Sequence, residues 1–280
     1  MTARSGANGL TLGIDIGGSG IKGAPVDLST GEFATDRLKI ATPKKSTPEN
    51  VVEVVAEIVE HFADQVGDGP IGITVPAIVK GGVTKSAANI HKSWIDYEAE
   101  ALFESELGRD VFLVNDADAA GVAEVKYGAA KDREGLVILT TLGTGIGSAM
   151  INNGVLLPNS ELGHLEIDGH DAESRAASRV KDEEDLSYEE YAKKRLQRYY
   201  ETVEFLFSPD LFVVGGGVSR KADKFLPHLK LQTPIIPAKL QNTAGIVGAA
   251  YLAADLSAHG LAHLAPARST DGQPVTAAER

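Results

Sequence analysis

The chain of 280 residues contains no cysteine. This absence excludes disulfide bonds, thiolate zinc sites, iron–sulfur clusters and cysteine nucleophiles, so any chemistry must use oxygen and nitrogen groups. No apolar run reaches the ~18 residues that would span a bilayer, and residues 1–9 lack the apolar stretch of a signal peptide. From these absences we expect a cytoplasmic protein without a membrane partner.

Positive charge is also scarce: 27 Lys and Arg residues against 39 Asp and Glu residues give a net charge of −12. The field of the whole molecule therefore repels nucleic acid and anionic membranes, and we expect no nucleic-acid partner. Screening acts over about 8 Å at physiological salt, so a local basic patch could still bind an anionic substrate.

Glycine is abundant, at 30 residues, and the first glycine loop follows an apolar, strand-like segment at residues 10–16. Its glycine spacing fits the dinucleotide pattern of a Rossmann dehydrogenase. That pattern requires a helix after the loop, whereas residues 21–27 continue as a strand into a turn. A Walker P-loop is excluded as well, because neither this loop nor the next has a lysine followed by Ser or Thr. With both motifs excluded, the loop is read as a tight turn flanked by Asp15 and Lys22. The backbone N–H groups of this turn can approach phosphate.

The same order, strand then glycine loop then returning strand, recurs in the second half of the chain. A strand at residues 136–139 leads into the glycine loop 143–147, and a further strand, at residues 211–214, ends in three consecutive glycines. Any one of these loops is as readily a hairpin turn that needs positive φ. Together they indicate a cleft between two lobes that faces phosphate from both sides.

The remaining segments predict an α/β protein with two lobes. A helix should begin after Thr47, as a hydroxyl N-cap, with Pro48 in its first turn, and a capping box at residues 187–190 should open a long helix reaching about residue 207. We assign residues 10–115 to the first lobe and 116–256 to the second, with the small-residue helix at 244–256 able to pack back on the first. Residues 175–185 are charged and expected to be mobile, and residues 265–280 to be a disordered tail.

Asn115 and Asp116 follow an apolar strand at residues 111–114, where an α/β sheet presents catalytic side chains. Asp116 is a candidate general base for a hydroxyl group, and Asn115 a candidate ligand of a neighbouring hydroxyl. Taken alone, the motif is more often a cap, in which Asp116 or Asp118 satisfies the start of the following helix.

A second polar cluster contains Glu161 and His164, with further carboxylates and imidazoles up to residue 173. This density could bind a divalent metal, but a helix-spaced pair of histidines is lacking and there is no thiolate. Hydrogen bonds to sugar hydroxyls fit Glu161 and His164 better, since carbohydrate pockets need such polar groups.

In order and content, six segments of the chain resemble the ROK family of sugar kinases, and within it the bacterial polyphosphate glucokinases. The matching stretches lie between residues 10 and 256 and read LGIDIGGSGIK at 12–22, SW at 93–94, VNDADA at 114–119, TLGTGIGS at 141–148, ELGH at 161–164 and VVGGGVS at 213–219. The resemblance implies a two-lobed, actin/hexokinase-like (ribonuclease H-like) ATPase fold with the active site in the cleft between the lobes.

The resemblance also implies an activity: phosphorylation of glucose at its 6-hydroxyl with inorganic polyphosphate, and also ATP, as donor. Asp116 would be the base, and the sugar would be held by Asn89, Asn115, Asp116, Glu161, His164 and Glu173. The donor phosphates would be bound by Gly17, Gly18, Ser19, Lys22, Gly143, Thr144 and Gly145. Asp15 would lie near a Mg²⁺ ion, directly or through water, and a nucleotide would pack on Gly215, Gly216 and Gly217.

One feature departs from many members of the family, which bind zinc through a cysteine cluster just after the Glu-x-Gly-His segment. This chain has no cysteine there, as in the polyphosphate glucokinases, so we expect no structural zinc. Three alternatives stay open: a kinase of the same fold acting on mannose, fructose or N-acetylmannosamine, a sugar-sensing regulator, and a binding protein with an inactive site. A homodimer is implied by the resemblance alone.

Overall fold

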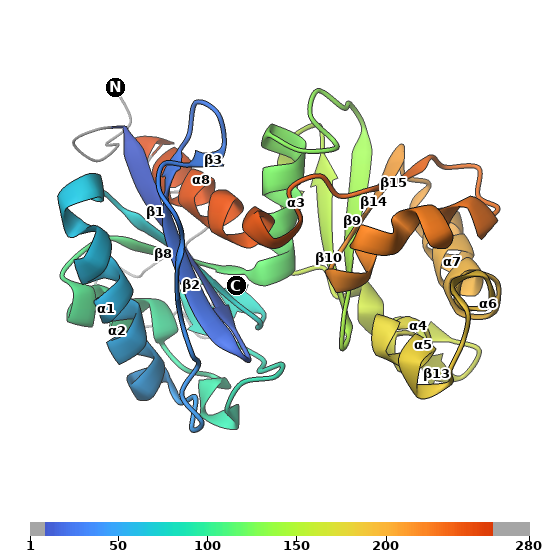
Figure 1. The fold of residues 1–280 in the computed structure, drawn as a ribbon, viewed down its shortest axis with the longest axis horizontal. Helices are drawn as coiled ribbons and strands as arrows, with labels where there is room; N and C mark the ends of the chain where they lie inside the picture. Colours follow the sequence, from blue (N-terminus) through green and yellow to red (C-terminus); the bar gives the residue numbers. More distant parts are fainter. Residues whose placement is uncertain (1–8, 260–280) are drawn as a thin grey trace, which may run out of the picture. The chain divides into compact units, whose positions relative to one another are not determined.

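The computed structural model describes residues 9–259, which form two compact units. Within these residues the first unit comprises 9–26, 34–114 and 249–259, and the second comprises 27–33 and 115–248. Each unit contains a β-sheet and several helices (Figure 1). The predicted α/β class is therefore confirmed.

The larger sheet has six strands in the order β3-β2-β1-β5-β8, and β4 also pairs with β2. Its strands are β1 (Leu10–Gly17), β2 (Gly20–Asp27), β3 (Glu32–Phe33), β4 (Leu38–Ile40), β5 (Ile71–Val75) and β8 (Val111–Asn115). The other elements before residue 115 are α1 (Pro48–Val66), α2 (Ala99–Leu107), the hairpin β6 (Val79–Lys80) and β7 (Val83–Thr84), and the 3₁₀ turn η1 (Lys92–Trp94). Strand β2 follows the first glycine loop directly, so the argument against a Rossmann fold is confirmed.

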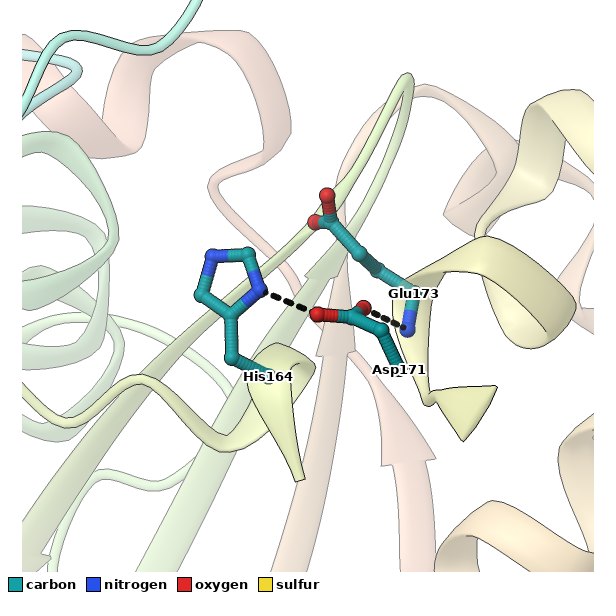
Figure 2. Close-up of side chains that lie close together, drawn as sticks. All are labelled: His164, Asp171 and Glu173. Atoms are coloured by element: carbon teal, nitrogen blue, oxygen red, sulfur yellow. Dashed lines mark hydrogen bonds and ion pairs between the residues drawn. The ribbon is translucent and has the colours of Figure 1, made fainter. Parts of the chain in front are cut away.

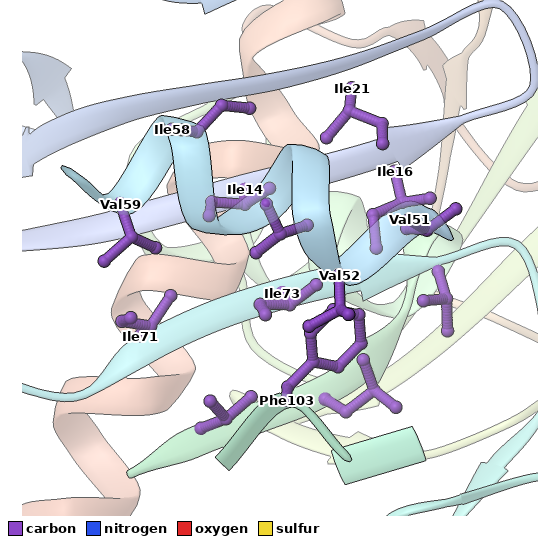
Figure 3. Packing of buried hydrophobic residues seen from close by; sticks show 14 of the residues in the cluster. Ile14, Ile16, Ile21, Val51, Val52, Ile58, Val59, Ile71, Ile73 and Phe103 are labelled. Carbon is purple, nitrogen blue, oxygen red and sulfur yellow. The ribbon is translucent and has the colours of Figure 1, made fainter. Parts of the chain in front are cut away.

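The core of the first unit lies between this sheet and α1 (Figure 3). Buried side chains recur on α1 at helical spacing, at Val51, Val52, Val55, Ile58, Val59 and Phe62. In β5, Ile71 and Ile73 belong to the same cluster, whereas Gly72 between them faces the opposite side of the sheet, as alternation in a strand requires. An added Cβ on Gly72 would lie 2.0 Å from the carbonyl oxygen of Ala249 in α8 (Ala244–His259). Gly72 is therefore needed for the close approach of α8 to the sheet.

The second sheet has the strand order β11-β10-β9-β14-β15. Its strands are β9 (Leu136–Leu142), β10 (Ile146–Asn152), β11 (Val155–Leu157), β14 (Leu211–Gly215) and β15 (Ile235–Pro237). Its helices include α3 (Asp116–Lys126), α4 (Glu173–Ala176), α5 (Ser178–Glu183), α6 (Tyr188–Tyr191), the π-turn η3 (Ala192–Leu196) and α7 (Gln197–Phe207). The smaller elements are η2 (Leu162–His164), β12 (Glu166–Ile167), β13 (His170–Asp171), η4 (Gly217–Lys224), η5 (Leu226–His228) and η6 (Gln241–Thr243).

Both faces of the second sheet are covered. Along β9, Val137 and Leu139 join one hydrophobic cluster, while Ile138 joins the other. Strands β9 and β14 run parallel, as do β14 and β15, whereas β9 and β10 are antiparallel. The strand ends at Leu142 and Gly215 therefore point the same way, which brings two glycine turns to one edge of the sheet.

Local predictions were confirmed in part. The capping box is present, since the Ser187 hydroxyl accepts from the Glu190 N–H and the Glu190 side chain accepts from the Ser187 N–H. The hydroxyl cap at Thr47 is wrong: the residue occupies the N-cap position of α1, but its side chain makes no capping hydrogen bond. The Thr47 hydroxyl is hydrogen-bonded to the carboxylate of Glu49 instead. The pKa of Glu49 is lowered first by its own backbone N–H and then by this hydroxyl.

The charged stretch at residues 175–185 is folded, contrary to the expectation that it is mobile. It contributes to α4 and α5, and Ala176, Ala177 and Val180 are buried in the core of the second unit. The predicted tail at 265–280 lies outside the described residues. Among residues 9–259 we find no helix with the length and hydrophobicity needed to cross a membrane.

Candidate active site

The first glycine loop forms the turn between β1 and β2 in the first unit. Asp15, near the end of β1, accepts a hydrogen bond on Oδ1 from the Thr74 hydroxyl at 2.9 Å, and its Oδ2 lies 3.1 Å from Nζ of Lys22. An added Cβ on Gly18 would lie 2.9 Å from the carbonyl oxygen of Asn89. The first unit therefore brings together four of the residues predicted for phosphate, metal and sugar binding: Asp15, Gly18, Lys22 and Asn89.

The second glycine loop lies between β9 and β10, and two side chains donate hydrogen bonds to its carbonyl oxygens. The Ser178 hydroxyl donates to the Gly143 carbonyl at 3.0 Å, and Nε of Arg179 donates to the Thr144 carbonyl at 2.7 Å. Within the loop, the Gly143 N–H donates to the Gly145 carbonyl at 3.0 Å. The start of α5, in the stretch that the sequence analysis expected to be mobile, thus fixes the shape of this loop.

Glu173 on α4 reaches the same loop. Its Oε2 accepts a hydrogen bond from the backbone N–H of Ile146 at 3.0 Å. An added Cβ on Gly145 would lie 2.4 Å from that oxygen, so a side chain there would displace the carboxylate from its present position. Glu173, predicted as a sugar ligand, therefore also contacts the end of the predicted phosphate loop.

The third glycine turn begins where β14 ends, beside β9. Gly215 pairs with Thr141 in the parallel register, and Gly216 has a φ of +79°. An added Cβ on Gly216 would lie 2.3 Å from the carbonyl oxygen of Leu142, directly before the second glycine loop. The predicted nucleotide-binding turn and the second phosphate loop are consequently neighbours.

Asp116 is the first residue of α3, and Asn115 is its N-cap. Oδ1 of Asn115 accepts from the N–H groups of Ala117 and Asp118 at 2.9 and 3.1 Å. Oδ1 of Asp116 accepts from the Ala117 N–H at 2.8 Å, and the side chain of Asp116 is exposed. The capping role suggested for the acidic residues thus belongs mainly to Asn115. The helix N-terminus favours a negative charge at Asp116.

Glu161 and His164 flank the short turn η2 and interact electrostatically. Glu161 is half-buried, and burial raises its pKa, whereas the nearby His164 lowers it and Glu173 raises it further. The mutual influence of these groups means that three of the predicted sugar-binding side chains lie near one another in the second unit.

His164 is oriented by Asp171, a residue to which the sequence analysis gave no role of its own (Figure 2). Nδ1 of His164 lies 2.8 Å from Oδ2 of Asp171, whose Oδ1 accepts from the Glu173 N–H at 3.2 Å. The hydrogen bond that His164 donates to Asp171 is the main reason that the pKa of His164 is raised, and the charges of Glu173 and Glu161 raise it further. Asp171 therefore links two of the predicted sugar ligands, His164 and Glu173.

The same three side chains have the composition of a divalent-metal site. One ligand atom from each of His164, Asp171 and Glu173 lies within 4.8 Å of the others. In each of the three residues one such atom already forms a hydrogen bond: Nδ1 of His164 and Oδ2 of Asp171 bind each other, and Oε2 of Glu173 binds the Ile146 N–H. The geometry therefore equally describes an imidazole that is held in place by a carboxylate.

Replacing Asp171 by asparagine should lower the pKa of His164. The carboxylate stabilises the imidazolium form, so this stabilisation is present at low pH and disappears as the pH rises through the raised pKa of His164. An NMR titration of the imidazole protons should show parent His164 titrating above 6.5 and the D171N variant titrating at lower pH. An unchanged midpoint would rule out this role for Asp171. Because the pair is exposed, we expect little change in stability.

A second residue without an assigned role, Asp118, connects these groups to the candidate base. It is buried in α3, and burial together with the charges of Glu161 and Asp116 raises its pKa to about 7, although a hydrogen bond from the Asn159 N–H opposes the shift. Both Asp116 and Glu161 therefore lie within electrostatic range of Asp118. The candidate base and the predicted sugar ligands of the second unit form one neighbourhood.

A cavity of about 230 Å³ in the second unit lies apart from the predicted site residues. It is lined by Ile167, Asp168, His170, Ala172, Arg175, Ala176, Lys194, Arg195, Arg198 and Tyr199. Most of its basic side chains are paired with carboxylates: Arg198 with Asp168, Arg195 with Glu184 and Lys194 with Glu190. The cavity is therefore only weakly suited to an anion.

Comparison with known proteins identifies the family of the chain. Residues 11–178 match the model of the ROK family. The chain is 53% identical over 240 residues to a polyphosphate glucokinase of Mycobacterium tuberculosis. The alignment covers 85% of this chain and 89% of that protein.

Solved structures of sugar kinases also match the chain. An inorganic polyphosphate/ATP-glucomannokinase from Arthrobacter sp. strain KM matches with a TM-score of 0.83 and 52% identity, covering 88% of this chain and 99% of that one. A ROK family glucokinase from Streptomyces griseus, solved with glucose and AMPPNP, matches with a TM-score of 0.72 and 25% identity, covering 90% and 100%. With its family model, close relatives, ordered motifs and fold in agreement, the chain belongs to the ROK family.

Proposed function

We propose that this chain transfers a phosphoryl group from inorganic polyphosphate to the 6-hydroxyl of glucose, and that it also uses ATP. The observation that carries the proposal is the neighbourhood of Asp116, Glu161, His164 and Glu173 in the second unit, beside the second glycine loop. The similarity to a polyphosphate glucokinase and to a polyphosphate/ATP-glucomannokinase supports glucose as acceptor and polyphosphate as donor.

Asp116 acts as the general base in this proposal. As the sugar oxygen forms its bond to phosphorus, the hydroxyl proton passes to the Asp116 carboxylate, while the bond between phosphorus and the bridging oxygen of the donor breaks. The exposure of Asp116 allows a sugar to reach it, and its place at the N-terminus of α3 favours the ionised form that a base needs.

The other sugar hydroxyls are held by side chains that can accept and donate hydrogen bonds. Glu161 and Glu173 offer carboxylate oxygens, and the exposed His164 ring keeps Nε2 available because Asp171 binds Nδ1. We also assign Asn115 and Asn89 to sugar hydroxyls. Fixing the sugar in this way supplies the orientation on which phosphoryl transfer depends.

The donor is bound by backbone N–H groups and a divalent cation. We assign the phosphate contacts to residues in and beside the two glycine loops: Gly17, Gly18, Ser19, Lys22, Gly143, Thr144 and Gly145. A Mg²⁺ ion fits Asp15, since Mg²⁺ is commonly held by one or two carboxylates together with substrate phosphates. Both Asp15 oxygens already accept from Thr74 or Lys22, which favours contact through water. The ion would neutralise charge on the donor phosphates.

For ATP, the adenosine moiety would pack on the turn formed by Gly215, Gly216 and Gly217. Mannose is the strongest candidate for a further acceptor, because the related Arthrobacter protein is described as a glucomannokinase. Fructose or N-acetylmannosamine would make the chain a different hexose kinase of the same family. A cytoplasmic location and a homodimer stay predictions.

A coupled assay for glucose 6-phosphate tests the proposal directly. Purified chain, glucose and Mg²⁺ are incubated in parallel with long-chain polyphosphate and with ATP, and mannose replaces glucose in a matched series. We expect product with polyphosphate, a measurable rate with ATP, and no product when the metal is chelated. Turnover of another hexose at a higher kcat/KM than glucose would instead favour the alternative kinase.

The polyphosphate reaction should be more sensitive to salt than the ATP reaction. A long chain places many phosphates near basic side chains, and each exposed contact is weakened by screening. Between about 50 and about 300 mM KCl we expect the KM for long-chain polyphosphate to rise by about threefold or more, with a smaller change for ATP. Steady-state kinetics at fixed free Mg²⁺ measure both. Equal salt dependence would mean that no extended polyphosphate contact exists.

A further inference from the structure

Asp118 is a buried carboxyl group to which the proposed reaction gives no role. Its side chain lies on α3 with the residue only 1% exposed. Oδ2 accepts a hydrogen bond from the backbone N–H of Asn159 at 2.7 Å, while Oδ1 is buried without a hydrogen-bond partner among the described residues. Burying a carboxyl group with one unsatisfied oxygen costs free energy, so a compensating role is expected.

The partner of Asp118 is the segment of residues 158–162, which we call the strap. The strap connects β11 to η2, and Asn159 within it has a φ of +61°. A second anchor is Ser148 on β10, whose hydroxyl donates to the Ser160 carbonyl at 2.7 Å and accepts from the Leu162 N–H at 2.9 Å. Glu161 lies between these anchor points. Its backbone is therefore tied to β10 by Ser148 and to α3 by Asp118.

Asp118 thus joins the helix that carries the candidate base to the strap that carries a predicted sugar ligand. Its helix carries Asp116 two residues earlier, and the strap that it holds carries Glu161 two residues after Asn159. Burial raises the pKa of Asp118 most, the hydrogen bond from the Asn159 N–H lowers it, and the charges of Glu161 and Asp116 raise it further. Below about pH 7 a proton on Asp118 avoids a third negative charge beside Asp116 and Glu161, whereas above that pH ionisation adds this charge.

We infer that Asp118 is a positioning residue for sugar recognition, because its carboxyl group ties the strap to α3 and so fixes Glu161 relative to Asp116. The inference rests on the proposed function, since it assigns Glu161 to the acceptor sugar. Asp118 itself need not touch the sugar. Its loss should therefore affect mainly the binding of glucose and less the chemical step.

Two substitutions separate this role from a general effect on folding. Asp118→Asn keeps an oxygen that can accept from the Asn159 N–H, whereas Asp118→Ala removes the tie. We expect Asp118→Ala to raise the KM for glucose about tenfold or more with kcat changed less than about threefold, and Asp118→Asn to restore the KM to within about threefold of the parent. Asp182→Ala, an exposed aspartate of the same unit, is the matched control and should leave both constants unchanged.

The pH dependence gives a second readout that a purely structural residue would not change. In the parent, ionisation of Asp118 near pH 7 adds a negative charge beside Glu161 and Asp116 and should steepen the alkaline fall of kcat/KM, and Asp118→Asn should make this fall shallower. If Asp118→Ala does not fold, this comparison of the parent with Asp118→Asn still decides. A parental KM in Asp118→Ala, or an alkaline fall that is equally steep in Asp118→Asn and in the parent, overturns the inference. An inactive parent with both donors would instead contradict the proposed function.

Discussion

Replacing Asp116 by asparagine should lower kcat by about 10²- to 10⁴-fold, the usual contribution of a general base. Asparagine keeps a side-chain oxygen that can accept from the Ala117 N–H, so the start of α3 should persist. The loss should appear with both donors, because the base acts on the sugar and not on the leaving group. Initial rates of glucose 6-phosphate formation with polyphosphate and with ATP measure the effect.

The control for Asp116 addresses stability and binding. A melting temperature close to that of the parent shows that the variant is folded, and calorimetric titration with glucose shows whether the sugar still binds. Asp182→Asn, on the surface of the same unit, should retain parental turnover. Activity of the Asp116 variant within threefold of the parent, with the fold intact, would falsify the assignment of the base.

Replacing Gly216 by alanine should produce the largest loss of stability among single substitutions in the glycine turns. The new Cβ would lie 2.3 Å from the Leu142 carbonyl oxygen and 2.6 Å from its backbone nitrogen, and neither backbone atom can move without disturbing β9. The φ of +79° adds strain for any residue with a side chain. Overpacking and backbone strain together should cost about 2–5 kcal/mol of unfolding free energy. Denaturant unfolding measures this cost.

Gly217 provides a matched control for Gly216. An added Cβ there would meet nothing within 4 Å, and the backbone conformation is not left-handed. Gly217→Ala should therefore change the unfolding free energy by less than about 1 kcal/mol, although it can weaken ATP binding if adenosine packs on this turn. Similar stability losses in the two variants would mean that the close approach of Gly216 to Leu142 is not what requires glycine.

Much of the fold could be predicted from the sequence because local patterns carried it. Apolar runs followed by glycine loops located β1, β9 and β14, and a hydroxyl residue followed by proline located the start of α1. The decision against a Rossmann fold needed only the strand-like residues after the first glycine loop. These signals act over a few residues, so no knowledge of distant neighbours was required.

The details of the candidate site depended on contacts that the sequence does not encode locally. Asn115, predicted only as a sugar ligand, also caps α3. The Thr47 hydroxyl binds the Glu49 carboxylate and makes no capping hydrogen bond to α1. Asp171 stood in a run of acidic and imidazole side chains, but its choice of His164 as a partner followed from the fold.

The charged stretch at residues 175–185 shows the limit of composition. Its charges suggested mobility, whereas Ala176, Ala177 and Val180 bury it, and Ser178 and Arg179 then hold the second glycine loop. Three small apolar side chains among many charges give no periodic signal strong enough to predict a helix. Only the core that receives them makes the segment fold.

The sequence by itself determined the α/β class, the glycine loops, the candidate base Asp116 and the exclusion of thiol chemistry, since residue types and short spacings suffice for these. The tertiary structure decided which side chains serve one another: Asp171 orients His164, Glu173 reaches the loop at Gly145, and Asp118 ties the strap to α3. The physical reason is that hydrogen bonds and desolvation depend on distances of a few ångströms between residues far apart in the chain, and folding alone sets those distances.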